Sequence, residues 1–137
     1  MRWITLARAL ATIALFTTTV AAAPASASQT AAIGPHVYST RITAATPAVP
    51  NGAWRLTINR RSFSVAKGTV LAVSGTARIA GNRITFHDLT GPFSCRGAQA
   101  TGVYSWRLGG KRLTLTAVRE PCAGRRTILT KPLAQIL

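Results

Sequence analysis

Residues 103–118 read VYSWRLGGKRLTLTAV, and this stretch decides the fold class. Apolar and polar side chains alternate on both sides of the pair Gly109-Gly110. Alternation with a period of two is typical of a half-buried β-strand, and a two-residue glycine turn between two such runs predicts an antiparallel hairpin. The inward side chains of the hairpin are expected to be Tyr104, Trp106, Leu108, Leu113, Leu115 and Ala117.

The same period of two extends back toward the N-terminus as far as Asn51. The pairs Arg60-Arg61, Lys67-Gly68 and Gly81-Asn82 predict turns between successive strands. The inward parity is expected to run through residues 69–80 without a break, with Gly75 at a bend or bulge of one long strand. The inward side chains of this part are expected to be Trp54, Leu56, Ile58, Phe63, Val65, Leu71, Val73, Ala77, Ile79, Ile84 and Phe86.

These strands predict an all-β domain, antiparallel throughout, with about seven or eight strands in meander order. A last strand is expected around Arg126–Thr130, after the second cysteine, and no stretch beyond residue 27 has a helical period as long as three turns. Closure into a small up-and-down barrel removes the exposed edges that a flat sheet would leave. An open sandwich is the alternative architecture.

The N-terminus has the pattern of a secretory signal peptide. Arg2 and Arg8 precede an uncharged, largely apolar stretch over residues 9–23, and Ala25-Ser26-Ala27 supplies the small residues of a cleavage site. Cleavage after Ala27 would remove residues 1–27. An uncleaved membrane anchor is the alternative, although the stretch is shorter than the roughly 18–20 residues that a spanning helix needs. We therefore expect a secreted, extracellular protein, and retention at the cell envelope is an alternative that stays open.

Cleavage of 27 residues from a chain of 137 leaves 110, which is enough for one domain. Residues 28–50 are rich in Ala, Thr and Pro and are expected to form a flexible tail, in which His36–Ile42 alternates enough to add an edge strand. Residues 51–137 are expected to form the barrel domain. We expect a monomer.

Cys95 and Cys122 are the only two cysteines. In an exported chain a disulfide is the default interpretation, and closing a loop of this length stabilises a fold by roughly 3–4 kcal/mol. Free or metal-binding thiols are the alternative, but the spacing does not resemble the paired spacing of zinc sites and no histidine lies nearby. No metal and no other cofactor is expected.

Several short motifs occur in a fixed order along the chain: Gly52-Ala53-Trp54, Gly75-Thr76, Gly91-Pro92 before Cys95, Tyr104-x-Trp106-x-Leu108 and Pro121-Cys122-Ala123-Gly124-Arg125. In these motifs, over about residues 52–132, the chain resembles the lipocalin-like (calycin) barrel proteins, and more closely a group of short secreted bacterial lipocalin-like proteins of unassigned function. The resemblance implies that Trp54 packs on the barrel floor and that a basic residue of the last strand, Arg125 or alternatively Arg126, lies across its ring. The other interpretation makes Trp54 a plain core aromatic and Arg125 a solvated charge.

The residues available for catalysis are few, and we expect no enzymatic activity. Asp88 and Glu120 are the only acidic residues, and nothing in the sequence pairs them as the two carboxylates of a glycosidase. His87 and Asp88 are adjacent, so on a strand they point to opposite faces and cannot adopt the usual His to Asp orientation of a nucleophilic site.

Two kinds of binding remain. Phe63, Phe86, Tyr104 and Trp106 are candidates to line a cavity for a small apolar ligand, or they simply fill the barrel. The 17 Lys and Arg residues against two acidic residues favour anionic cell-envelope polymers or lipids, with Arg60, Arg61, Lys111 and Arg112 as candidate anion-binding residues. Specific nucleic-acid recognition is not expected, because base stacking needs exposed rings and the aromatic residues have inward parity. Two alternatives stay open: an inhibitor of a secreted protease that presents Arg96, and a basic wall-associated protein with no ligand.

Overall fold

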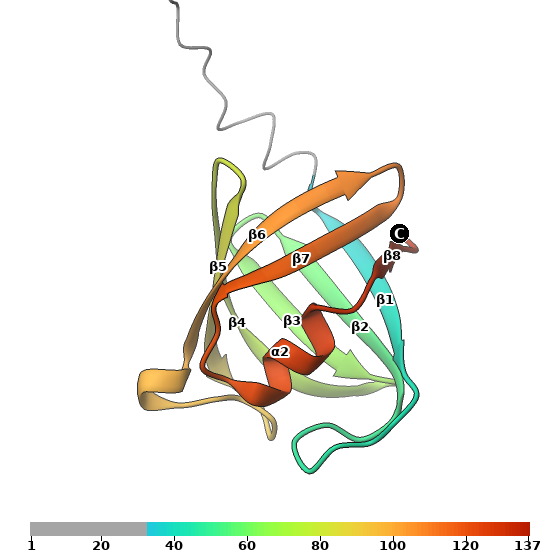
Figure 1. Cartoon of the computed structure of the whole chain (residues 1–137), viewed down its shortest axis with the longest axis vertical. Helices are drawn as coiled ribbons and strands as arrows, with labels where there is room; N and C mark the ends of the chain where they lie inside the picture. Colours follow the sequence, from blue (N-terminus) through green and yellow to red (C-terminus); the bar gives the residue numbers. More distant parts are fainter. Residues whose placement is uncertain (1–32) are drawn as a thin grey trace, which may run out of the picture.

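The computed structural model describes residues 33–137 as a closed antiparallel barrel of eight strands, β1 to β8, in which each strand pairs with the next and β8 pairs with β1 (Figure 1). The predicted signal peptide and its cleavage site lie outside the described residues. The all-β, up-and-down barrel expected from the alternating pattern is confirmed. The strands are β1 (His36–Ile42), β2 (Gly52–Asn59), β3 (Ser62–Lys67), β4 (Val70–Ala80), β5 (Arg83–Thr90), β6 (Thr101–Gly109), β7 (Arg112–Arg119) and β8 (Leu133–Gln135). The 3-10 helix η1 (Gly97–Gln99) precedes β6, and the α-helix α2 (Ala123–Leu129) lies between β7 and β8.

The first strand is a full member of the barrel. His36–Ile42 pairs with all but the end of β2 on one side and with β8 on the other, through Tyr38 opposite Gln135 and Ser39 opposite Ala134. The strand expected over His36–Ile42 is present, but it is paired on both sides and is not an edge strand. The barrel therefore includes residues before the boundary predicted at residue 51. The short β8 closes the barrel, because it also pairs with β7.

Four tight turns of two residues each join neighbouring strands, and the first residue of each turn has a positive φ angle. It is 54° at Arg60, 59° at Gly68, 58° at Gly81 and 58° at Gly110. Glycine is favoured there because it has no Cβ to clash in the left-handed region. The turn between β6 and β7 is Gly110-Lys111, one residue later than predicted, because Gly109 still belongs to β6.

The inward parity breaks in β4, contrary to the prediction. Val65 of β3 lies opposite Val73 while Ala66 lies opposite Leu71, so Ala72 is the extra residue of a bulge. This bulge turns Leu71 outward, where it is 50% exposed, and buries Ala72 instead. A second irregularity occurs between Ser74 and Gly75 on the β5 side, at the glycine expected to mark a bend or bulge.

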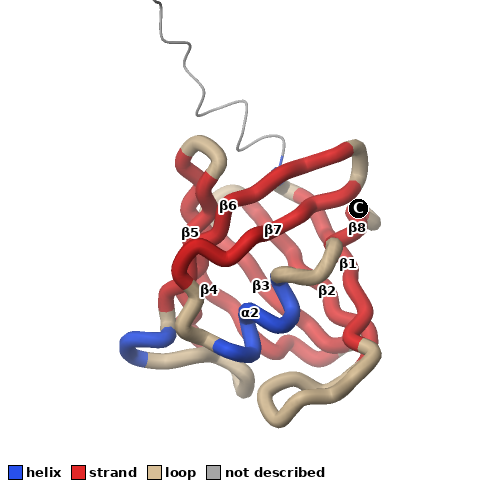
Figure 2. The backbone as a smooth tube through the Cα atoms, in the orientation of Figure 1, coloured by secondary structure: helices blue, strands red, loops and turns tan. Residues whose placement is uncertain are grey.

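The prediction of a strand around Arg126–Thr130 is wrong, because these residues belong almost entirely to helix α2. Arg125, Ile128 and Leu129 are its buried residues, and their spacing of three and four is that of one face of a helix. Two helical turns are too short for this period to stand out in the sequence. Figure 2 shows α2 lying across one end of the barrel.

The interior of the barrel is filled by side chains. Phe63, Phe86 and Tyr104 are buried and pack edge to face, with ring centroids 4.8 Å and 5.8 Å apart along the series. Trp106 is only half-buried, and its indole N–H donates to the carbonyl oxygen of Gly81 at 3.1 Å. Within residues 33–137, no helix is long and apolar enough to cross a membrane.

Candidate functional site

A buried arginine stands at the end of the barrel that α2 covers. The Arg125 side chain is 4% exposed and forms ion pairs with Asp88 of β5 at 2.6 Å and with Glu120, the residue after β7, at 2.7 Å. Its other hydrogen bonds go to Oε1 of Glu120 at 2.8 Å and to the carbonyl oxygens of Ala100 at 2.8 Å and Gln99 at 3.1 Å. A guanidinium has five N–H donors, and these five bonds engage all of them.

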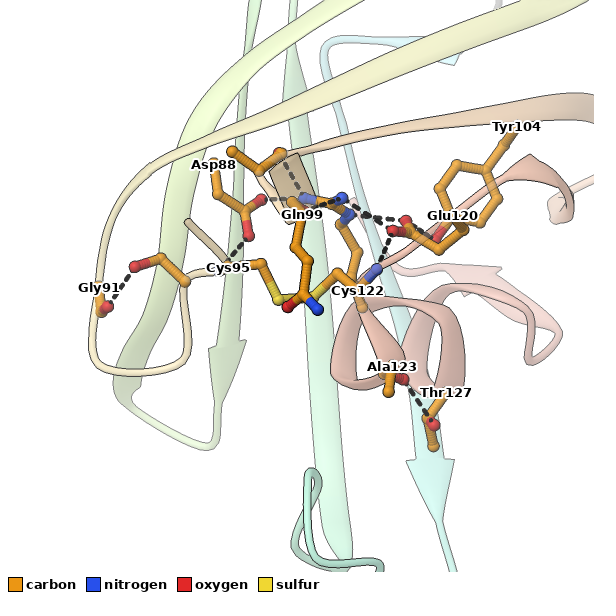
Figure 3. The surroundings of a disulfide bond; sticks show 12 residues. Asp88, Gly91, Cys95, Gln99, Tyr104, Glu120, Cys122, Ala123 and Thr127 are labelled. Atoms are coloured by element: carbon orange, nitrogen blue, oxygen red, sulfur yellow. Dashed lines mark hydrogen bonds and ion pairs between the residues drawn. A yellow bond between two sulfur atoms is a disulfide. The ribbon is translucent and has the colours of Figure 1, made fainter. Parts of the chain in front are cut away.

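The two carboxylates are tied to the disulfide as well as to Arg125. The expected Cys95–Cys122 disulfide is present, and the backbone N–H of Cys95 donates to Asp88 at 2.8 Å while that of Cys122 donates to Glu120 at 2.9 Å. The phenolic O–H of Tyr104 donates to Oε2 of Glu120. Figure 3 shows Asp88 and Glu120 on either side of this cluster, with the disulfide beside it. We call Arg125, Asp88, Glu120, Tyr104 and the disulfide the buried ionic cluster.

Space for the buried ionic cluster depends on a glycine of β6. A Cβ atom at Gly102 would collide with the carboxylate of Glu120 and with Nη2 of Arg125. Gly102 occupies an inward position, two residues before Tyr104, so any side chain there would point into the cluster.

Burial and hydrogen bonding change the ionisation of the groups in the cluster. Burial, reinforced by the hydrogen bond to Glu120, raises the pKa of Tyr104 well above its ordinary value. For Arg125, burial alone would lower the pKa, but the hydrogen bonds and charges of Glu120 and Asp88 outweigh it and raise the pKa. Arg125 therefore stays a cation, and the cluster carries two carboxylates against one guanidinium. Among residues 33–137 no buried polar side-chain atom lacks a hydrogen-bond partner.

Trp54 lies at the same end of the barrel as the cluster. It is fully buried, and its indole N–H donates to the carbonyl oxygen of Pro50 at 3.1 Å. Trp54 and Arg125 border the same cavity of about 30 Å³, beneath Ile128 of α2. The ring packed edge-on against Trp54 is that of Phe93, with the centroids 6.0 Å apart, and no cation–π contact with Arg125 is found among the described residues.

The four candidate cavity residues are not part of the cavity beside Trp54. Phe63, Phe86, Tyr104 and Trp106 are absent from the walls of the 30 Å³ cavity, whose size corresponds to about one water molecule. Three of the four, Phe63, Phe86 and Tyr104, pack on one another as described above, in the arrangement expected of side chains that fill the barrel.

The chemistry of the cluster offers neither a metal site nor a catalytic pair. A carboxylate oxygen of Asp88 and the sulfur atoms of Cys95 and Cys122 lie within 4.8 Å of one another. The two sulfurs are bonded to each other, however, and metals bind the thiolate form. Both acidic residues are held by Arg125 and are buried, so neither can reach a substrate in solution.

The basic residues lie on the outside, and the four candidate anion-binding residues separate into two groups. Arg60 and Arg61 form the turn between β2 and β3 and line an open groove on the outer wall. Lys111 and Arg112, at the turn between β6 and β7, do not line that groove. Arg96 is exposed next to the disulfide, just before η1.

The alternation of inward and outward residues along the sequence could have predicted one member of the buried ionic cluster. Asp88 follows Ile84 and Phe86 at the same spacing of two, which places it on the inward face of β5. Glu120 had no such signal, because a bulge between β6 and β7 places Val103 opposite Arg119 and Tyr104 opposite Ala117, so that Val118 is extra.

Comparison of the chain with protein-family models, with characterised proteins and with solved structures finds no match.

Proposed function

We propose that the protein is a secreted, non-enzymatic lipocalin-like barrel that binds anionic material of the cell envelope through its outer surface. The observation that carries the proposal is the location of its acidic residues. Asp88 and Glu120 are the only acidic residues of the chain, and both are buried against Arg125. The outer wall therefore carries basic side chains with no acidic side chain to pair with them.

The number of uncompensated cations supports this proposal. Of the 17 Lys and Arg residues, two precede the described residues and Arg125 is buried, which leaves 14. All of these are exposed except Lys67, which is half-buried. The only ion pairs among residues 33–137 are those of Arg125. A surface of one charge sign attracts polyanions and concentrates them by long-range electrostatics.

A small apolar ligand is the less supported alternative. A barrel that carries such a ligand needs an interior space of some hundreds of Å³, whereas the apolar cavity here is about 30 Å³. The interior aromatic rings pack on one another at normal contact distances. We therefore assign binding to the outer wall.

The test uses protein recovered from the medium of cells that express the full chain. Binding to linear polyphosphate and to phosphatidylglycerol vesicles is measured by titration at several salt concentrations. We expect saturable binding at about 0.15 M salt, with the logarithm of the affinity falling linearly as the logarithm of salt concentration rises. No saturable binding to either probe at that salt concentration would refute the proposal.

A further inference from the structure

One groove on the outer wall concentrates cationic and hydroxyl side chains. It is open to solvent, has a volume of about 1490 Å³ and runs from the β2–β3 turn across β4 to β5. We define the arginine groove by six of its residues: Arg60, Arg61, Arg78, Ser62, Thr76 and Thr85. Its volume exceeds what a single inorganic anion fills, so it suits a segment of a longer molecule.

Strand pairing sets the arrangement of these side chains. Ser62 of β3 lies opposite Thr76 of β4, and Arg78 of β4 lies opposite Thr85 of β5, all in a regular antiparallel ladder. The carbonyl oxygen of Arg61 accepts a hydrogen bond from the backbone N–H of Ala77 at 2.9 Å, which holds the β2–β3 turn against β4. Arg61 is thereby fixed beside the strand that carries Arg78.

Arg60 occupies a position where a non-glycine residue is costly. The other three two-residue turns have glycine at the equivalent position, with nearly the same φ angle. An L-residue in this left-handed conformation carries a steric cost that glycine avoids. Strained backbone of this kind is concentrated at functional sites. A charged side chain at this costly position, in a groove that Arg61 and Arg78 also line, is consistent with a binding role.

We propose that the arginine groove binds a linear phosphate-bearing polymer, whose phosphates contact Arg60, Arg61 and Arg78 and the hydroxyls of Ser62, Thr76 and Thr85. This proposal rests on the function proposed above and gives it a site and a ligand class. Guanidinium groups bind phosphate oxygens through paired hydrogen bonds, and hydroxyls can donate to the remaining oxygens.

The groove also disfavours nucleic acid as its occupant. Its lining includes no Phe, Tyr or Trp side chain, and the one aromatic ring among its described lining residues is the imidazole of His87, whose Nδ1 lies 2.7 Å from the hydroxyl of Thr101. Binding of single strands relies on bases stacked on aromatic rings. A polymer of phosphates without bases fits the lining better.

The test compares two variants that lose the same charge. The groove variant is R60G/R61S/R78Q, and the matched control is R107Q/K111Q/R112Q, which removes three exposed cations near the β6–β7 turn. Affinity for linear polyphosphate, for hyaluronate as a carboxylate polymer and for a single-stranded oligothymidylate is measured at one salt concentration. The urea unfolding midpoint of each variant, and of R60G alone, checks the fold.

We expect the groove variant to lose affinity for polyphosphate by roughly 10- to 100-fold, and its salt dependence to fall by about three counterions, while the control loses less than about threefold. R60G should unfold at a higher urea concentration than the wild type and still bind polyphosphate more weakly, which separates a lost contact from a damaged fold.

If both triple variants lose affinity for polyphosphate equally, the arginine groove is not the binding site, although general polyanion binding by the basic surface would still stand. Equal or tighter binding of hyaluronate or of the oligothymidylate by the wild type would overturn the phosphate-polymer assignment. Failure of the wild type to bind any of the three polymers would refute the arginine groove as a polymer-binding site and would remove polymer binding from the proposed function. Of that function, only binding to anionic lipid vesicles would then remain.

Discussion

Replacing Arg125 with methionine should destabilise the protein far more than loss of any other basic residue. The side chains of Arg125, Asp88 and Glu120 are 4%, 1% and 0% exposed, so water cannot replace the guanidinium. Removing one partner of a buried ion pair costs about 3–5 kcal/mol, because the remaining charge stays desolvated and unpaired. Here one cation serves two carboxylates, which places the expected loss at the upper end of that range.

The assay is equilibrium unfolding in urea, followed by tryptophan fluorescence. With an m-value of about 1.5 kcal/mol/M, a loss of 3–5 kcal/mol lowers the midpoint by about 2–3 M. Arg126, the next residue of α2, is exposed and is the matched control. We expect R126M to shift the midpoint by less than about 0.3 M, in line with the small effects of surface substitutions.

A third variant tests whether charge imbalance is the cause. The combination R125M/D88N/E120Q removes all three charges and keeps side chains of similar shape, and neutral replacements of buried ion clusters are often tolerated. It should recover more than half of the stability that R125M loses. If R125M lowers the midpoint by less than about 0.5 M, as an exposed ion pair would, the reasoning about the buried ionic cluster is wrong.

Three further results are expected. Gly102→Ala should cost at least about 2 kcal/mol, because its Cβ displaces Glu120 from its partners; a midpoint within error of the wild type would contradict this. Burial raises the pKa of Tyr38 to about 12 and that of Tyr104 higher still, so tyrosinate absorbance at 295 nm should stay low at pH 11 in the folded protein and appear near pH 10 in urea. Because the folded state holds these protons more tightly, stability should be constant below about pH 10 and fall as pH rises toward 12, and a rise over that interval would be inconsistent with buried phenols. The pair C95S/C122S should lower stability by about 3–4 kcal/mol under oxidising conditions, and the wild type should lose a similar amount with a reductant.

The alternating pattern was sufficient to predict the barrel, because inward and outward residues of a strand differ in polarity at every step. It failed where the ladder skips a residue. The bulge at Ala72 reverses the parity of Leu71, and no glycine or proline marks that point. Helix α2 was also missed, because in a seven-residue element the buried positions Arg125, Ile128 and Leu129 include a charged residue.

Some contacts of the candidate site could be predicted from short stretches of sequence, and others depend on the complete fold. The cysteine count, together with the export expected from the N-terminal pattern, predicted the disulfide, since two cysteines allow only one pairing. The pairing of Asp88 with Glu120 through Arg125 joins residues 37 and 5 positions apart, and depends on the closure of the barrel and on the entry of α2. Those contacts are set by the fold as a whole, so no short window of sequence contains them.

The placement of the acidic residues also predicts how salt affects stability. The 14 outer cations have no acidic side chain among them, and charges of one sign on a compact surface repel one another. Added salt screens this repulsion, while the ion pairs of Arg125 are buried and are screened much less. Raising NaCl from about 0.01 M to about 0.5 M, where the Debye length falls from about 30 Å to well below 10 Å, should therefore raise the urea midpoint steadily.

A neutral osmolyte at the same osmolality is the control for effects of salt on water activity. The groove variant and its matched control each lack three of the 14 cations, so both should respond to salt less steeply than the wild type, and by similar amounts. Salt that lowers the midpoint would mean that attractive ion pairs dominate the surface, which is incompatible with both carboxylates lying inside the barrel. Stability and polyanion binding thus have opposite dependences on salt, because the same unpaired surface charge destabilises the fold and attracts the ligand.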